Sequence, residues 1–487
     1  MDSWLVILPP ALAIGLAVVT RHAIGALLVG VWVGWIIATG ELAGGTGAAV
    51  SQLVAVFGDP GQTSVVLFTL LMGSFLEIVT RCGGIAGFLV WLQRWPWTGT
   101  RRGAELLAAG LGLGVFVEST VTCLVVGSVG RPVFDRLGIT REKLAYICDS
   151  TSAPVCMLIP FNSWGGLILG LLTAQSIPGT QPMGLFLAAV PLNFYALLTV
   201  LLVFAVAVTG RDLGPMKGAA ARARQQTGAM ETPGDNENRF GPASPTNQAR
   251  LLVLPLAAMV GTVFTSLAVT GRASVREANL DAPRLLDYLN GASGSTAVLW
   301  GVLVALILAG IIALIAERGQ PPRLLDLAFA GAGTMLPIAT LLVLAFAIGD
   351  VCDILGTGEF LAAQAAPHLT ASVAAPVAFL TTGLIAFSIG TSWGTFAIMI
   401  PLAVPLALTM TAAGDPVSVP LMVSAVLGGG VFGDHCSPIS DTSLISSVAA
   451  GCDHIDHVRT QLPYALLAAA GTVVLYLVAG PVMAVAG

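Results

Sequence analysis

The chain has 487 residues, of which 56% are hydrophobic and only 10% are charged, and its formal net charge is −5. Soluble domains carry about 25% charged residues, so this composition excludes an ordinary water-soluble fold and indicates a protein that lies in a lipid bilayer. The acidic balance and the lack of a basic stripe give no reason to expect a nucleic-acid partner.

Apolar segments long enough to cross a hydrocarbon core of about 30 Å recur along almost the whole chain. The first of them has no basic leader and no small-residue cleavage site, so we interpret it as a spanning helix and not as a signal peptide. Ten spans are predicted, near residues 4–20, 23–39, 62–80, 142–175, 184–209, 251–270, 295–316, 329–350, 420–450 and 461–485.

Two further apolar segments, near 103–130 and 372–412, are interrupted by polar clusters. The first contains Glu118-Ser119-Thr120-Val121-Thr122, and the second contains Thr391-Ser392-Trp393-Gly394-Thr395. Because each cluster lies in the middle of apolar sequence, we predict two re-entrant hairpins with polar tips.

The stretch 210–250 is rich in Gly, Pro, Gln, Asn and Arg, which is typical of a solvated linker. It divides the chain into a first half, 1–209, and a second half, 251–487. An N-terminus outside the cell places every Lys and Arg except Arg272, Arg276 and Arg284 on the inner side. The positive-inside rule therefore predicts external termini and a cytoplasmic linker in a bacterial inner membrane.

The two halves show co-linear matches that indicate an internal repeat. At one offset Glu77 matches Asp350, and the two hairpin tips match through Ser119 and Ser392. Later, the run Asp149–Pro154 matches the run Asp434–Pro438. Five spans and one hairpin per half make the second half enter the membrane from the opposite side, which is the inverted-repeat plan of many secondary transporters. The predicted fold is therefore an all-α polytopic membrane protein.

The densest polar cluster in an apolar region is the run 433–443, which contains Pro438. A proline cannot donate a helical hydrogen bond, so an unwound stretch is expected there, and the matching run Asp149–Pro154 is expected to supply a second one. Bare backbone at membrane depth is tolerated only where it lines a protein or water cavity. Its carbonyl oxygens, with Ser, Thr and Asp oxygens, are hard ligands suited to Na⁺.

Carboxylates inside a membrane cost several kcal/mol unless they are paired or functional. A buried carboxyl can also exchange a proton for a cation, which is the chemistry of an antiporter. The predicted site therefore comprises Asp149, Ser150, Thr151, Asp434, Ser437, Asp441, Thr442, Glu118, Ser119, Ser392, Thr395, Glu77 and Asp350, with Na⁺ at Asp149, Asp434 and Ser437. Glu77 and Asp350 could alternatively lie near span ends and face water.

A second interpretation treats His435, Cys436 and the run Cys452–His457 as soft-metal ligands, although they lack a familiar tetrahedral spacing. We interpret His454 and His457 as part of a hydrated helix end near the cytoplasmic surface, with pH sensing as the alternative. The sequence has no phosphate-binding loop and no dinucleotide fingerprint, so we predict no cofactor and expect transport to be driven by ion gradients or to be passive. The seven cysteines are interpreted as small apolar core residues.

The run from Gly433 to Pro463, GDHCSPISDTSLISSVAAGCDHIDHVRTQLP, resembles the signature of the NhaC sodium/proton antiporter family. Three further stretches, 388–396, 149–155 and 116–119, resemble the same family. The resemblance implies a scaffold domain, a moving transport domain, an elevator-like motion and a homodimer. It also implies that the hairpin tips and the breaks at Asp149 and Asp434 converge on one midplane site.

The predicted function is exchange of Na⁺ for H⁺ across the inner membrane by alternating access. The alternative is a Na⁺- or H⁺-coupled carrier of a small organic acid, such as malate or lactate, or of an amino acid, since the family that the chain resembles includes such carriers. An intramembrane metal enzyme or a channel is a third candidate. No arginine is placed inside a span to grip a carboxylate, which favours a small cation, although backbone amides at hairpin tips can bind carboxylates too.

Overall fold

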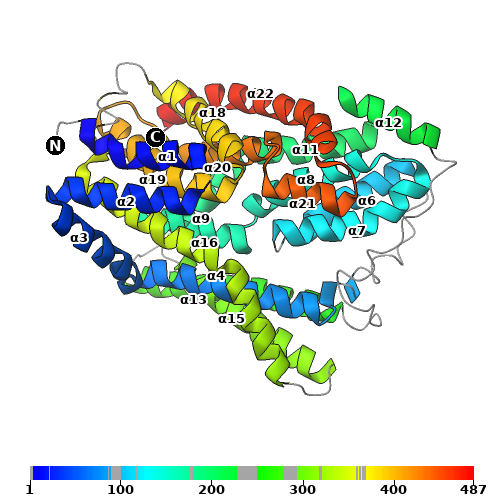
Figure 1. Cartoon of the computed structure of the whole chain (residues 1–487), viewed down its shortest axis with the longest axis horizontal. Coiled ribbons are helices and arrows are strands. Elements are labelled where there is room, and N and C mark those ends of the chain that lie inside the picture. Colours follow the sequence, from blue (N-terminus) through cyan, green and yellow to red (C-terminus); the bar gives the residue numbers. More distant parts are fainter. Residues whose placement is uncertain are drawn as a thin grey trace.

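The computed structural model describes residues 4–20, 22–85, 87–88, 100–116, 118–175, 177, 180–226, 249–277, 293–316, 321–357, 360, 364 and 369–486. These residues form helices that pack into one elongated body, with no strand among them (Figure 1). Eight of the described helices are long and apolar enough to cross a membrane, or up to ten if each of two bent helix pairs counts as one span. The all-α polytopic fold is confirmed.

The first half and the linker contain the elements up to α12. They are η1 (Trp4–Ile7), α1 (Leu8–Thr20), α2 (Ala23–Thr39), α3 (Leu42–Ala55), η2 (Val56–Gly58), α4 (Pro60–Arg81), α6 (Arg101–Gly114), α7 (Ser119–Leu137), α8 (Arg141–Leu158), α9 (Ser163–Ala174), α10 (Pro182–Ala189), η4 (Val190–Leu192), α11 (Phe194–Thr209) and α12 (Pro215–Gln226). The last of these lies within the predicted linker, whose residues 227–248 are outside the described part of the chain.

The second half contains eight described helices. They are α13 (Arg250–Glu277), α15 (Gly294–Ala316), α16 (Pro321–Leu355), α18 (Ala371–Ile389), α19 (Ser392–Ala412), α20 (Val419–Cys436), α21 (Asp441–Ala450) and α22 (His454–Ala486). Among the predicted span and hairpin segments, 103–130 falls on α6 and α7, and 372–412 falls on α18 and α19.

The set of membrane-crossing candidates differs in detail from the predicted spans. Helix α3 was not expected, and α1 and α2 are shorter than the usual crossing length. Helix α6 has 14 residues, which rise only about 21 Å. In the second hairpin, however, α18 and α19 are each long and apolar enough to cross. The two hairpins are therefore unequal in length.

The break in the first half lies after the position that the sequence indicated. Residues 149–154 are helical throughout, because α8 continues through Pro154 to Leu158, and α9 begins at Ser163 with a bend of 45° between the two helices. Every residue from Lys143 to Met157 is buried, so packing on all sides holds the helix together where Pro154 removes one hydrogen bond. In the second half the break lies between Cys436 and Asp441, as expected.

The helices of the two halves pack in a reciprocal pattern. Helix α4 of the first half packs on α15 of the second half, and α16 of the second half packs on α2 of the first half. Helices α4 and α16 also pack on each other. Likewise, α11 contacts α8 in its own half and α20 in the other half, and α22 contacts α20 in its own half and α8 in the other half. This is the pattern expected of two related halves, and their opposite orientation across the bilayer stays a prediction.

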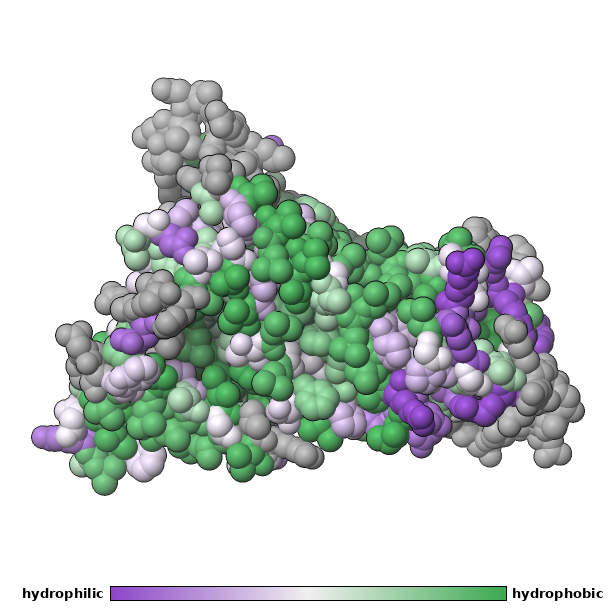
Figure 2. All heavy atoms as spheres, turned by 90° about the horizontal axis from the view of Figure 1, so that it is seen from above, coloured by the Kyte–Doolittle hydropathy of each residue, from purple (hydrophilic) through white to green (hydrophobic). Residues whose placement is uncertain are grey.

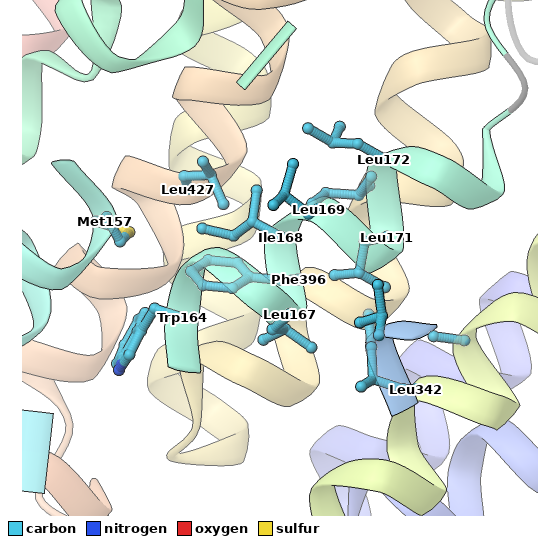
Figure 3. Packing of buried hydrophobic residues seen from close by; sticks show 14 of the residues in the cluster. Met157, Trp164, Leu167, Ile168, Leu169, Leu171, Leu172, Leu342, Phe396 and Leu427 are labelled. Atoms are coloured by element: carbon cyan, nitrogen blue, oxygen red, sulfur yellow. The ribbon is translucent and has the colours of Figure 1, made fainter. Parts of the chain in front are cut away.

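Helix α9 is buried almost completely and forms part of the protein's core. Its residues Trp164, Leu167 and Ile168 point toward neighbours that include Phe396 of α19 and Leu427 of α20 (Figure 3). The half-helix that follows the first break is therefore fixed by apolar packing from several elements.

The surface is divided by polarity along the long axis. Figure 2 shows apolar side chains over most of one face, while hydrophilic residues gather at the end of the molecule where α6, α7 and α12 lie. An apolar surface of this extent is what a bilayer covers.

Candidate functional site

Asp434 lies in the last turn of α20, immediately before the break, and is fully buried. Ser392 Oγ, at the first residue of α19, donates a hydrogen bond of 2.9 Å to Asp434 Oδ2. Thr442 Oγ1, in the first turn of α21, lies 3.5 Å from the same oxygen. A buried carboxylate thus faces hydroxyl oxygens at the N-terminal ends of two helices, where backbone N–H groups also favour negative charge.

Asp149 lies in the middle of α8 and is also fully buried. Its Oδ2 accepts hydrogen bonds from Ser443 Oγ at 2.8 Å and from Gln461 Nε2 at 2.7 Å. His457 Nε2 lies 3.3 Å from the same oxygen. Three side chains of α21 and α22 therefore hold one oxygen of Asp149.

Ser443 and Gln461 connect the two carboxylates. Besides contacting Asp149, Ser443 Oγ lies 3.4 Å from the backbone oxygen of Asp434, and Gln461 Nε2 donates to the backbone oxygen of His435 at 3.2 Å. One group thus draws on both halves of the chain. We call it the carboxylate cluster and define it as Asp149, Asp434, Ser392, Thr442, Ser443, His457 and Gln461.

Several buried polar atoms in and beside the carboxylate cluster have no hydrogen-bond partner in the described part of the protein. They are Asp149 Oδ1, Ser150 Oγ, Asp434 Oδ1, His435 Nε2, His457 Nδ1 and Gln461 Oε1. A buried polar group without a partner costs about 1–3 kcal/mol, and more when it is charged. Their concentration in one place indicates a polar space that suits water or a polar or charged ligand.

Trp164, in the first turn of α9, lies between the tips of the two hairpins. Its Nε1 donates to Ser119 Oγ at 3.2 Å, and its ring meets that of Trp393 edge to face with 5.5 Å between centroids. Ser119 Oγ in turn lies 3.1 Å from Glu118 Oε1, and Glu118 caps α7. The tip of the first hairpin is thus tied to Trp164, whereas Ser392 of the second contacts Asp434.

The structure brings together four of the predicted site residues, Asp149, Asp434, Ser392 and Thr442, with Ser150 adjacent in sequence. The hydroxyls of four others bond elsewhere: Thr151 to Ile147 O, Ser437 to Phe387 O, Thr395 to Thr391 O, and Ser119 as described. Asp441 is exposed, and its carboxylate accepts from the Thr442 N–H.

Glu77 and Asp350 lie on α4 and α16, and their recorded polar partners are outside the carboxylate cluster. Glu77 pairs with Arg81 at 2.8 Å, and its side chain is 23% exposed. Asp350 accepts a hydrogen bond from Gln52. Both residues therefore match the alternative that they lie away from the site, near the ends of their helices.

Three members of the carboxylate cluster, Ser443, His457 and Gln461, were not among the predicted site residues. The interpretation of His457 as part of a hydrated helix end was wrong, because its side chain is fully buried against Asp149. His457 and Gln461 are four residues apart, so they lie on one face of α22. That spacing was the available signal, but the sequence does not say which way the face turns.

His435 and the cysteines have other surroundings than a metal site requires. His435 Nδ1 lies 2.9 Å from Tyr195 OH, and the cysteines in the described part of the chain form no disulfide with one another. Within the described ranges, no group of three or more His, Cys, Asp and Glu side chains could hold a metal ion.

The amino-acid sequence of this chain is similar to a family profile and to several known proteins. A sequence profile described as the Na⁺/H⁺ antiporter family matches residues 155–481. An uncharacterized protein of Haemophilus influenzae is 33% identical over 97% of this chain and 90% of its own length. An arginine/ornithine antiporter, ArcD, of Halobacterium salinarum is 34% identical over 26% of this chain and 25% of its own length. A malate-2H⁺/Na⁺-lactate antiporter of Bacillus subtilis is 34% identical over 22% of each chain.

Two solved structures resemble this fold. The YdaH transporter of Alcanivorax borkumensis has a TM-score of 0.62 and 14% identity, and the match covers 89% of this chain and 88% of that chain. MtrF of Neisseria gonorrhoeae has a TM-score of 0.53 and 14% identity, covering 89% and 84% respectively. At this identity, the likeness concerns the arrangement of helices.

Proposed function

We propose, from the premise that this chain belongs to the Na⁺/H⁺ antiporter family, that it exchanges Na⁺ for H⁺ across the bacterial inner membrane by alternating access. The chain is a polytopic membrane protein, and its family and structural neighbours are transporters. The observation that carries the proposal is the carboxylate cluster, in which two fully buried carboxylates each keep one oxygen without a partner among the described residues.

Competition between Na⁺ and H⁺ follows from the chemistry of these groups. Burial favours the protonated form of an isolated carboxyl, and a cation held by its oxygens favours the charged form. Asp434 supplies such an oxygen, and the hydroxyls of Ser392 and Thr442 lie within 3.5 Å of its carboxylate. Arrival of Na⁺ releases the proton, and departure of Na⁺ lets a proton return.

Asp149 has a second role in the proposal. Because Ser443, His457 and Gln461 hold its Oδ2, the carboxylate cannot turn freely, and its Oδ1 stays available to the ion. Of the three ligands predicted from sequence, Asp149 and Asp434 remain. The hydroxyl of Ser437 is bonded to Phe387 O, and Thr442 takes its place in the proposal.

Alternating access requires that the cluster face one side of the membrane at a time. The supporting features are the two broken helices and the two hairpins whose tips meet at Trp164. An elevator-like motion of these elements, in a homodimer, is part of the proposal.

The alternative is an ion-coupled carrier of a small organic acid or an amino acid, and the names of the Halobacterium and Bacillus relatives support it. Recognition of a carboxylate commonly uses the paired donors of an arginine. Within the ranges that the structure describes, the side-chain partners of Asp149 and Asp434 are hydroxyl, amide and imidazole groups, with neither Lys nor Arg among them. This observation favours a small cation.

The test is ²²Na⁺ uptake by proteoliposomes with an imposed pH gradient, with and without a panel of organic acids and amino acids. We expect uptake driven by the pH gradient alone. Uptake that appears only with an organic partner would identify the alternative carrier and refute simple exchange.

A further inference from the structure

A buried ion network lies at the hydrophilic end of the molecule. Lys143 Nζ on α8 lies 2.9 Å from Glu105 Oε1 on α6 and 3.0 Å from Asp212 Oδ1 between α11 and α12. The three side chains are only 4%, 6% and 10% exposed. We call Glu105, Lys143 and Asp212 the lysine triad.

The lysine triad carries one more negative than positive charge, and Glu105 Oε2 is buried without a hydrogen-bond partner in the described part of the chain. Removing charges from water costs several kcal/mol each, so a buried ion network is weak evidence for a stabilising role. Arg101, four residues before Glu105 on α6, adds a second positive charge beside this carboxylate. A buried carboxylate with one oxygen left unbonded suits a group that takes up and releases a proton.

A pocket of about 160 Å³ adjoins the lysine triad and includes all three of its members in its lining. The pocket also includes Arg101, Arg102 and Gly210, which are exposed. The triad therefore borders a space that reaches the protein surface.

Polar side chains on α8 continue from the lysine triad toward the carboxylate cluster. Tyr146 is three residues after Lys143 and three before Asp149, a spacing that places the Cβ atoms of successive members about 5–6 Å apart. Tyr146 is 1% exposed, and its hydroxyl has no partner in the described part of the protein. On α22, Tyr464 stacks on Tyr146 with 4.4 Å between ring centroids, on the helix that also carries Gln461.

We propose that this column, Asp149, Tyr146 and the lysine triad, carries protons between the carboxylate cluster and the surface pocket. A proton leaving the cluster passes by the Tyr146 hydroxyl and intervening water to Glu105 or Asp212. That carboxylate then releases it to water in the pocket, and the reverse sequence returns a proton to the cluster. Lys143 keeps the triad from holding two negative charges unopposed. This inference rests on the proposed function, because it needs proton exchange at the cluster.

The test compares Glu105→Gln and Tyr146→Phe with the wild type in proteoliposomes. We expect both variants to fold and to keep their Na⁺ KM within about twofold, while maximal exchange falls by about tenfold in Glu105→Gln and severalfold in Tyr146→Phe. Glu105→Asp, which keeps the acid, should recover much of the rate. A slow proton step should also increase the rate ratio between H₂O and D₂O in the impaired variants.

Asp135→Asn is the matched control, because Asp135 pairs with Arg141 at 2.9 Å near the start of α8 but lies outside the column. It should exchange at the wild-type rate with an unchanged isotope ratio. Wild-type rates in both Glu105→Gln and Tyr146→Phe would overturn the relay while leaving the proposed function standing. If Asp135→Asn instead loses as much activity as these two variants, and the isotope ratio is unchanged in all three, the relay is overturned too. No exchange by the wild type would instead refute the proposed function, and the relay with it.

Discussion

The two buried carboxylates share one arrangement of their oxygen atoms. In Asp149 and in Asp434, side-chain donors contact Oδ2, and Oδ1 has no partner in the described part of the chain. The protein thus fixes the direction of each carboxylate while leaving one oxygen for a ligand. Loss of the charge and loss of a donor should therefore have different effects on transport.

Asp434→Asn should abolish ²²Na⁺/H⁺ exchange in proteoliposomes, because the amide keeps the side-chain shape but loses both the charge that binds Na⁺ and the proton site. Expression and the melting temperature should stay close to those of the wild type. Asp326→Asn is the control, since Asp326 is exposed on α16 and should retain most of the activity. Substantial exchange by Asp434→Asn would remove this residue from the site.

Ser392→Ala should raise the KM for Na⁺ by about tenfold with a smaller loss of maximal rate, because a hydrogen bond to a charged group is worth about 1.5–3 kcal/mol. From the sequence, Ser119 is predicted to line the same site, because its hairpin tip matches that of Ser392. In the structure Ser119 contacts Trp164 and Glu118, so we expect the KM of Ser119→Ala to change by less than about threefold. Equal KM values in the two variants and the wild type would show that neither serine contacts the ion.

At the scale of single residues, the sequence identifies polar residues within apolar segments, but it does not identify the side chains that they contact. Asp149, Asp434 and Ser392 stand out because a polar group within an apolar run is costly. His457 and Gln461 belong to a run with Asp453, Asp456 and Arg459, which reads equally well as a hydrated helix end. Only the packing of α22 against α8 decides between the two interpretations.

The element that the sequence placed least well is the first broken helix. A proline marks a position where one hydrogen bond is missing, and Pro154 is tolerated inside the buried helix α8. The actual break depends on a cap, since Asn162 Oδ1 accepts from the Gly165 N–H at 2.9 Å and its Nδ2 donates to two carbonyl oxygens at the end of α8. Apolar periodicity alone does not reveal such a connection.

Asn162→Ala should lower the free energy of unfolding by about 2 kcal/mol or more, because it removes a cap and leaves buried backbone groups without partners. Thr100→Ala provides the comparison, since Thr100 caps α6 through the Gly103 N–H at an exposed position. That change should cost about 1 kcal/mol. Thermal unfolding in detergent would measure both, and equal small shifts would argue against a structural role for the bonds of Asn162.

At the scale of the molecule, the sequence predicts the number and character of the apolar segments better than their crossing lengths. The packing of α4 on α15 and of α16 on α2 is compatible with the repeat, which stays a prediction. The domain boundaries and the orientation in the membrane stay predictions. The amino-acid composition does not predict that α6 is shorter than α18, because each of them is the first helix of an interrupted apolar segment.

A cysteine introduced at Gln226, the last residue of α12, should not react with an impermeant thiol reagent added outside intact cells. The reason is the Lys/Arg asymmetry, which predicts a cytoplasmic linker. Reaction after permeabilisation is the positive control. Strong labelling of intact cells would reverse the orientation and the sides assigned to the hairpins.

Trp164 connects the hairpin tips of both halves, by a hydrogen bond to Ser119 and by ring contact with Trp393. A shared contact makes the free energy of opening one tip depend on the state of the other, so we expect the two hairpin tips to be thermodynamically linked. A double-mutant cycle between Ser119→Ala and Trp393→Leu, read from melting temperature and from Na⁺ leak without proton exchange, would measure this linkage. We expect a coupling of about 1 kcal/mol, lost in a Trp164→Phe background, which removes the N–H donor. Strictly additive effects would mean that the tips open independently, and tight exchange would then need another source of coordination.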